Sequence, residues 1–232
     1  MTGLNTILTL ALTLVPAAAA APPDKLEDAR NRQDRAYLEN AVREFKGAAE
    51  KKSGDAGVQY QLAQAQSYLA EVNLELKDKD AARAAAEEGI RAAERAVELQ
   101  PQTAENHRIL GTLCGQVIPA HVMLAFKYGR CARSSIDRAI EIDPKSSKAY
   151  MSRGVGNYYL PAALGGGVEL AVRDFQKSIE LDPKSADAYL WLGIALRKLN
   201  RNAEARKEIA KSLELNPSRI WAKQQFEKTP EK

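Results

Sequence analysis

From about residue 24 onward, apolar and polar residues follow one another in amphipathic runs with a helical period, which predicts a chain of helices. Four similar strings separate the later runs: Glu-Leu-Gln-Pro ending at Pro101, Glu-Ile-Asp-Pro at Pro144, Glu-Leu-Asp-Pro at Pro183 and Glu-Leu-Asn-Pro at Pro217. Proline cannot continue a helix, and it pushes the residue before it out of the helical region. Each string therefore ends one helix and precedes the next.

Residue sizes repeat at fixed distances from these prolines. Small residues lie ten positions after a proline (Gly111, Gly154, Gly193) and twelve before the next one (Ala132, Ala171, Ala205), and a larger apolar residue lies eight before it (Ile136, Phe175, Ile209). Small residues let two antiparallel helices approach closely, and the larger residue fills the space beside them. Each segment between prolines therefore predicts a pair of packed helices.

This pattern resembles the tetratricopeptide repeat (TPR) family, whose 34-residue unit is a helix–turn–helix. The last unit, from Pro183 to Pro217, has the family's length and carries Tyr189, Gly193 and Ala205 at the family's offsets. The resemblance implies an all-α, TPR-type solenoid of about four and a half repeats spanning residues 24–229. Its parts are a half-unit at 24–53, units at about 56–101, 104–144, 147–183 and 186–217, and a capping helix at 219–228.

The units shorten along the chain. In the last unit 12 residues separate Gly193 from Ala205, whereas 26 separate the corresponding Ala63 and Gly89. Helix-compatible sequence fills this first insertion, so its two helices are expected to exceed those of the last unit by about two turns each. Pro119 is expected to interrupt the next unit, and Gly165–Gly167 are expected to form a loop.

The N-terminus differs from the rest of the chain. Leu4 to Val15 is mostly apolar, the run from Ala17 to Ala21 is small, and the first charge is Asp24. An apolar segment followed by small residues is typical of a cleavable signal peptide, here predicted at 1–20. A membrane anchor is the alternative, but about a dozen apolar residues are too few to span a bilayer. The mature chain is therefore expected to be exported, periplasmic or secreted from a bacterium, without a transmembrane segment.

Composition and charge bear on the kind of partner that the chain can bind. Charged residues make up 28% of the chain and the net charge is +4, spread along the sequence. Nucleic-acid binding would require a concentrated basic face with aromatic residues, so we expect no nucleic-acid partner. The stretch Lys127, Arg130 and Arg133 is compatible with a solvated helix face or with a dock for an acidic partner.

In TPR proteins the first helix of each unit lines the concave face, which is the usual binding surface. The resemblance places the groove of this chain at Tyr60, Gln64, Arg108, Thr112, Met151, Val155, Tyr158, Leu190, Ile194 and Arg197. The later members are mostly apolar, which favours an extended peptide or an apolar ligand. The alternative is that the C-terminal helix covers them and makes them core.

Other side chains indicate structure rather than chemistry. Cys114 and Cys131 are the only cysteines, and export makes a disulfide between them compatible with the even count; two buried thiols are the alternative. His107 occupies a packing position, and no cluster with metal-ligand spacing accompanies it, so no metal and no cofactor are expected. No nucleophile with a supporting base is visible, so we expect no enzymatic activity.

These observations favour a non-catalytic scaffold or adaptor of the cell envelope, which binds a protein or peptide on its concave face. The alternative is a small-molecule or lipid-binding subunit of a transport system. Lengthened repeats of this kind also resemble those of uncharacterised exported bacterial TPR proteins.

Overall fold

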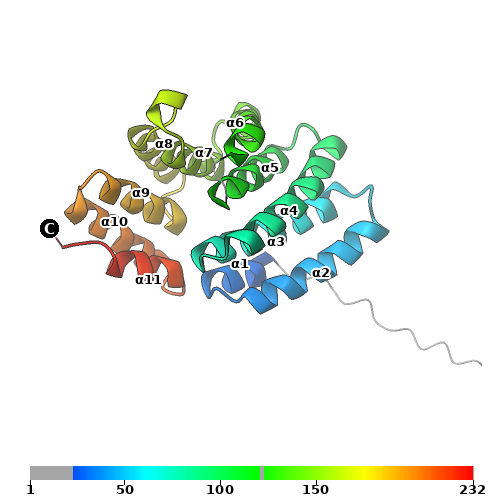
Figure 1. Cartoon of the computed structure of the whole chain (residues 1–232), viewed down its shortest axis with the longest axis horizontal. Helices are drawn as coiled ribbons and strands as arrows, with labels where there is room; N and C mark the ends of the chain where they lie inside the picture. Colours follow the sequence, from blue (N-terminus) through cyan, green and yellow to red (C-terminus); the bar gives the residue numbers. More distant parts are fainter. Residues whose placement is uncertain (1–22, 121–122, 232) are drawn as a thin grey trace, which may run out of the picture.

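The structure is a computed structural model that describes residues 23–120 and 123–231. The predicted signal peptide at 1–20 and His121 lie outside these residues. The described residues form α-helices and two short 3₁₀ helices, and they contain no β-strand. The helices pair antiparallel into a curved solenoid, as Figure 1 shows, which confirms the all-α, TPR-type fold.

Five helix pairs and one last helix build the solenoid. The pairs are α1 (Pro23–Asn31) with α2 (Arg35–Lys51), α3 (Ala56–Glu75) with α4 (Lys79–Leu99), α5 (Ala104–Val117) with α6 (Leu124–Ile142), α7 (Ser147–Tyr159) with α8 (Val168–Leu181), and α9 (Ala186–Lys198) with α10 (Asn202–Leu215). The helix α11 (Ile220–Glu227) follows as the cap. The segment expected as a half-unit is thus a pair, although its first helix has only nine residues.

Local sequence explains where many of these helices begin and end. Asp34, Asp55 and Asp78 accept hydrogen bonds from backbone N–H groups in the first turns of α2, α3 and α4. The tight turns after α3 and α9 each contain a residue with positive φ, Lys77 and Asn200, a conformation that often ends helices.

The predicted differences in unit length are confirmed. Helices α3 and α4 have 20 and 21 residues, whereas α9 and α10 have 13 and 14, a difference of about two turns per helix. Helix α5 ends before Pro119, in the 3₁₀ helix η1 (Ile118–Ala120). The third insertion contains η2 (Ala162–Leu164) and a loop in which Gly165 and Gly167 have positive φ.

The small-and-large packing inferred from the prolines is present in the pairs. A methyl group placed on Gly154 would lie 2.5 Å from the ring of Phe175, and one on Gly193 would lie 2.5 Å from Ile209. Buried apolar residues form one cluster across α1–α6 and two smaller clusters across α7–α11. No described helix is both long and apolar enough to cross a bilayer.

The solenoid curls until its two ends meet. Figure 1 shows α11 (red) beside α1 (blue), although almost 190 residues separate the groups that touch: Arg219 donates to the backbone oxygen of Arg30 at 3.3 Å.

Candidate functional site

The inner face of the solenoid is lined by α3, α5, α7 and α9, as the family resemblance implies. Tyr60 and Gln64 on α3 and Thr112 on α5 are half-buried there. The Tyr60 hydroxyl donates to Glu105 at 3.2 Å, and Thr112 hydrogen-bonds Ser152 of α7 at 3.1 Å. Gln64 donates one long bond, 3.4 Å, to the Tyr68 hydroxyl. Tyr60, Gln64 and Thr112 form a polar row on two consecutive inner helices, and the bond from Thr112 to Ser152 links the row to the third.

Several predicted groove residues are not available to a ligand in this conformation. Leu190 and Ile194 are buried with Ile209 and Ala222, because α10 and α11 pack over α9. Arg197 is held by α11, donating to the backbone oxygen of Gln225 at 3.2 Å. The expectation of an exposed apolar row is therefore wrong for these residues, and the alternative that the C-terminal helix covers them is correct.

The remaining apolar groove residues lie on α7. Met151, Val155 and Tyr158 are half-buried and pack against the cluster around Phe175. The ring of Tyr158 lies 5.8 Å from that of Trp191 in an edge-on arrangement. Most of their apolar surface is therefore used within the solenoid.

Arg108 is buried in an ion pair instead of lining an open groove. Its Nε donates to both carboxylate oxygens of Glu105, at 2.9 and 3.0 Å. Burial works to raise the pKa of Glu105, but the attraction of Arg108 outweighs it and lowers that pKa. The adjacent Tyr60 has a raised pKa because of burial. The inner face beside α3 and α5 thus carries a fixed pair of opposite charges.

Five charged residues close the inner face where the chain ends meet, and we name them the end clasp: Arg30, Glu71, Glu75, Asp187 and Arg219. Arg30 of α1 contacts Asp187 of α9 at 2.6 Å. Arg219, just before α11, contacts Glu71 at 2.7 Å and also pairs with Glu75, both on α3. The side chains of Arg219 and Glu75 are only 1% and 3% exposed. The clasp is therefore a desolvated ionic network between the first and last units.

The electrostatics of the clasp are uneven. Burial, with the nearby charge of Glu71, raises the pKa of Glu75 to about 7, despite the attraction of Arg219. Burial also works to raise the pKa of Asp187, but Arg30 and Arg219 outweigh it and lower that pKa. Glu75 ends α3, where the helix dipole disfavours a negative charge, whereas Asp187 lies in the first turn of α9, where the dipole favours one.

The clasp residues were not predicted as functional, although one signal for them exists in the repeat. Two positions after Pro101, Pro144 and Pro183, the residues Thr103, Ser146 and Ser185 precede a helix as N-caps. Arginine caps a helix start poorly, yet Arg219 occupies this position before α11. Arg30 and Asp187 carry no comparable signal, because only the curl of the solenoid brings them together.

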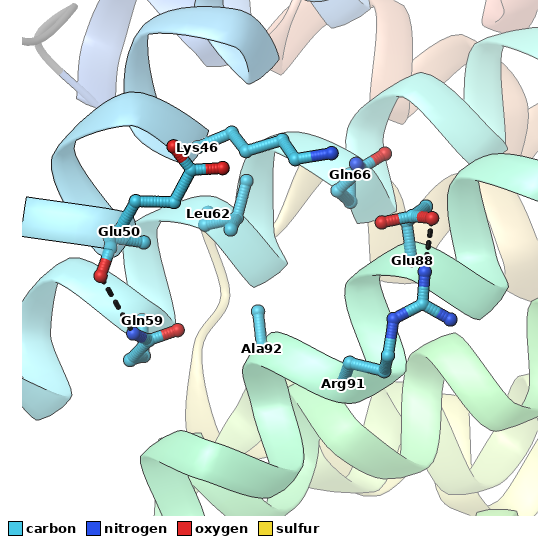
Figure 2. Close-up of a pocket in the computed structure, with 9 residues that line it drawn as sticks. Lys46, Glu50, Gln59, Leu62, Gln66, Glu88, Arg91 and Ala92 are labelled. Atoms are coloured by element: carbon cyan, nitrogen blue, oxygen red, sulfur yellow. Dashed lines mark hydrogen bonds and ion pairs between the residues drawn. The ribbon is translucent and has the colours of Figure 1, made fainter. Parts of the chain in front are cut away.

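The outer side carries two shallow hollows between α2 and α4, above α3. Their volumes are about 240 and 270 Å³. Figure 2 shows the first: Lys46 reaches over it from α2, Arg91 and Glu88 lie on the α4 side, and Gln59 and Leu62 form its floor. Both hollows are open to solvent and have walls that mix charged, amide and apolar side chains, so they do not form an enclosed site for a small ligand.

The remaining candidate residues have structural contacts. Cys114 and Cys131 form a disulfide that ties α5 to α6. The Nε2 atom of His107 lies 2.8 Å from the backbone oxygen of Pro101. Within the described residues, no three His, Cys, Asp or Glu side chains are grouped to hold a metal ion. The Arg133 side chain pairs with Asp137 at 3.8 Å on an exposed face of α6.

Comparisons with known proteins agree with this architecture. The family model described as Regulator of microtubule dynamics protein 1-3 matches residues 23–161, and a tetratricopeptide repeat model matches residues 175–207. No curated protein sequence matches the chain.

Solved structures show the same fold. The thermophilic TPR protein TTC0263 of Thermus thermophilus is 17% identical, with a TM-score of 0.60, covering 88% of this chain and 97% of that one. The haemophore HusA of Porphyromonas gingivalis is 18% identical, with a TM-score of 0.54, covering 79% and 96%.

Proposed function

This chain belongs to the family of regulator of microtubule dynamics proteins 1-3, and from that premise we propose that it is a non-catalytic scaffold that binds a protein partner along its inner face. TPR-type solenoids are protein–protein interaction scaffolds, because stacked units present a long surface without needing a catalytic centre.

The polar row of Tyr60, Gln64 and Thr112 is the observation that carries the inner-face proposal. Its members come from two adjacent units, so an extended peptide lying across the units meets one after another. Gln64 makes only a long hydrogen bond, which it can exchange for a bond to a peptide backbone. Because Leu190 and Ile194 are buried, this polar part of the face supports a peptide better than a small apolar ligand.

We place the protein in the cell envelope as part of the same proposal. The pattern at residues 1–20 is that of an export signal. The disulfide between Cys114 and Cys131 fits an oxidising compartment, since such bonds are rare in the reducing cytosol. The name of the family refers to microtubule dynamics, whereas these two features favour a setting in the cell envelope for this chain.

Site-specific photo-crosslinking tests the inner-face proposal. A photoreactive residue replaces Gln64 in one variant and the exposed Glu94 of α4 in a control variant, and crosslinked partners from the envelope are identified by mass spectrometry. We expect one protein to be captured at position 64 and not at 94. Isothermal titration calorimetry with that partner should show about tenfold weaker binding for Tyr60→Ala with Gln64→Ala. Equal capture at both positions, or unchanged affinity, would refute the proposal.

A further inference from the structure

The closure between the chain ends is polar, unlike the contacts between neighbouring units. The apolar cluster that contains α1 and α3 includes no residue of α9 or α11, and the clusters around α9 and α11 include none of α1 or α3. The ends are joined by the end clasp and by a 3.4 Å hydrogen bond from Gln224 to Gln33. Ionic contacts therefore hold the solenoid closed where no apolar core does.

From this geometry we propose that the end clasp is a proton-sensitive latch that controls access of the partner to the inner face. The inference rests on the proposed function, since it assigns a regulation to the same face. When the latch is closed, the two ends are held together across the opening of the inner face; when it opens, the first and last units separate and the polar row becomes more accessible.

Arg30 connects the latch to the inner face. Its guanidinium lies 5.3 Å from the centre of the Tyr68 ring, while it pairs with Asp187 across the opening. The Tyr68 hydroxyl in turn accepts a hydrogen bond from Gln64 of the polar row. Burial raises the pKa of Tyr68. When the pair with Asp187 is lost, Arg30 is free to leave the Tyr68 ring, which then becomes more exposed.

The charge balance of the latch supports proton control. Two guanidinium groups, Arg30 and Arg219, face three carboxylates, those of Glu71, Glu75 and Asp187. One bound proton balances these charges within the clasp, whereas its loss leaves an uncompensated negative charge in a desolvated site.

Glu75 is the group best placed to hold that proton. Gln33 from the α1–α2 turn and Arg219 before α11 donate to its carboxylate, and Glu71 from α3 itself repels it. Arg30 of α1 and Asp187 of α9 belong to the same network through their contacts with Glu71 and Arg219. Lys148 of α7 acts on the same network through Asp187. The raised pKa of Glu75, about 7, means that its carboxyl group loses the proton near neutral pH. The latch should thus be closed near pH 5.5 and loosen as the pH rises past 7.

The sequence also indicates that Arg219 is there for the clasp. Its position before α11 is filled by Thr103, Ser146 and Ser185 before α5, α7 and α9, which are residue types preferred at a helix start, whereas arginine is not. In addition, the Nε atoms of Arg30 and of Arg219 itself are both buried without a hydrogen-bond partner among the described residues. A closure with unused donors is one whose stability is finely balanced.

Distance measurements by pulsed electron paramagnetic resonance test the latch without any partner. Spin labels are attached at Lys25→Cys on α1 and Lys223→Cys on α11, both exposed, while the native cysteines stay in their disulfide. Labels at Lys207→Cys and Lys223→Cys, both beyond the clasp, serve as the matched control pair. We expect the longer-distance population to grow severalfold between pH 5.5 and pH 8.5 in the first pair alone.

Two variants make the outcome specific. Glu75→Gln keeps an acceptor for Arg219 but cannot ionise, so its ends should stay together at both pH values. Arg219→Ser should separate them at both. The proposal is overturned if the wild-type distances do not change with pH, or if Glu75→Gln changes as much as the wild type.

Hydroxyl-radical footprinting separates the latch from the proposed function. Oxidation of Tyr68 should rise severalfold in Arg219→Ser relative to the wild type, whereas that of the half-exposed Tyr159, at the end of α7, should be unchanged. An unchanged Tyr68 would overturn the latch. If Tyr68 becomes accessible and crosslinking at position 64 still captures no partner, the latch stands and the inner-face function fails.

Discussion

Replacing Arg219 by Ser tests the energetic contribution of the end clasp. The substitution removes the only described cation that pairs with Glu75, and it installs the residue type found before the helices of the preceding units. Glu75 then remains in a site where its side chain is 3% exposed, without a counter-charge on α11. The substitution therefore weakens the clasp and improves the start of α11.

The expected magnitude follows from these contacts. Breaking a buried ion pair by removing one partner costs about 3–5 kcal/mol, because the other charge stays desolvated. A serine cap returns about 1 kcal/mol. We therefore expect the free energy of unfolding to fall by about 2–4 kcal/mol at pH 5.5, where the clasp is closed and the substitution leaves Glu71 and Asp187 without this cation. At pH 8 the loss should be smaller, since the clasp of the wild type is already loosened there.

Urea unfolding followed by far-ultraviolet circular dichroism measures this loss. Arg201→Ser is the matched control, because Arg201 also precedes a helix, α10, but its pair with Glu204 is exposed. Its unfolding midpoint should stay the same or rise slightly, as expected for an exposed ion pair replaced by a better cap. A loss below about 1 kcal/mol for Arg219→Ser at pH 5.5 would contradict the assignment of a buried clasp.

Three further predictions concern stability. Between pH 5 and 8 the free energy of unfolding of the wild type should fall by up to about 3 kcal/mol relative to that of Glu75→Gln. The pKa of Glu75 is about 7 in the folded protein, so its contribution to stability is complete below the ordinary carboxyl pKa and is lost as the pH rises through 7. Urea curves that shift equally with pH for the two proteins would contradict this. Reducing the disulfide should lower stability by about 3 kcal/mol, measured as a lower melting temperature. In α7, Gly154→Ala should destabilise by about 1–3 kcal/mol through the clash with Phe175, whereas Gly156→Ala, which meets no atom within 4 Å, should stabilise by about 0.5–1 kcal/mol.

The sequence predicts the helix pairs because the rules that form them are local. A proline ends a helix wherever it lies, and Gly193 can only be small because Ile209 occupies the space beside it. The same offsets predict the longer α3 and α4 and the interruption at Pro119. Each of these predictions depends on residues within one unit.

The site was harder to predict because it depends on how units rotate relative to one another. Leu190 belongs to the groove by its offset in the repeat, yet α11 buries it, and the length of the chain after Pro217 does not reveal where that helix packs. Arg30 and Asp187 lie 157 residues apart and meet only because small rotations between units add up to a closed curve. No pattern within a unit encodes that sum.

The polar nature of the closure bears on function. Trp221 and Phe226 of α11 cover the apolar end of the stack, where Leu190 and Ile194 are buried, so this end is sealed by apolar contacts. The contact between the two ends uses charges instead, and charges can be replaced by solvent or by the polar groups of a partner at little net cost. Apolar residues at the clasp positions would fuse the ends permanently and leave the polar row on α3 and α5 unused. A closure built from arginines and carboxylates is therefore the kind that a peptide-binding solenoid requires if its inner face is to open.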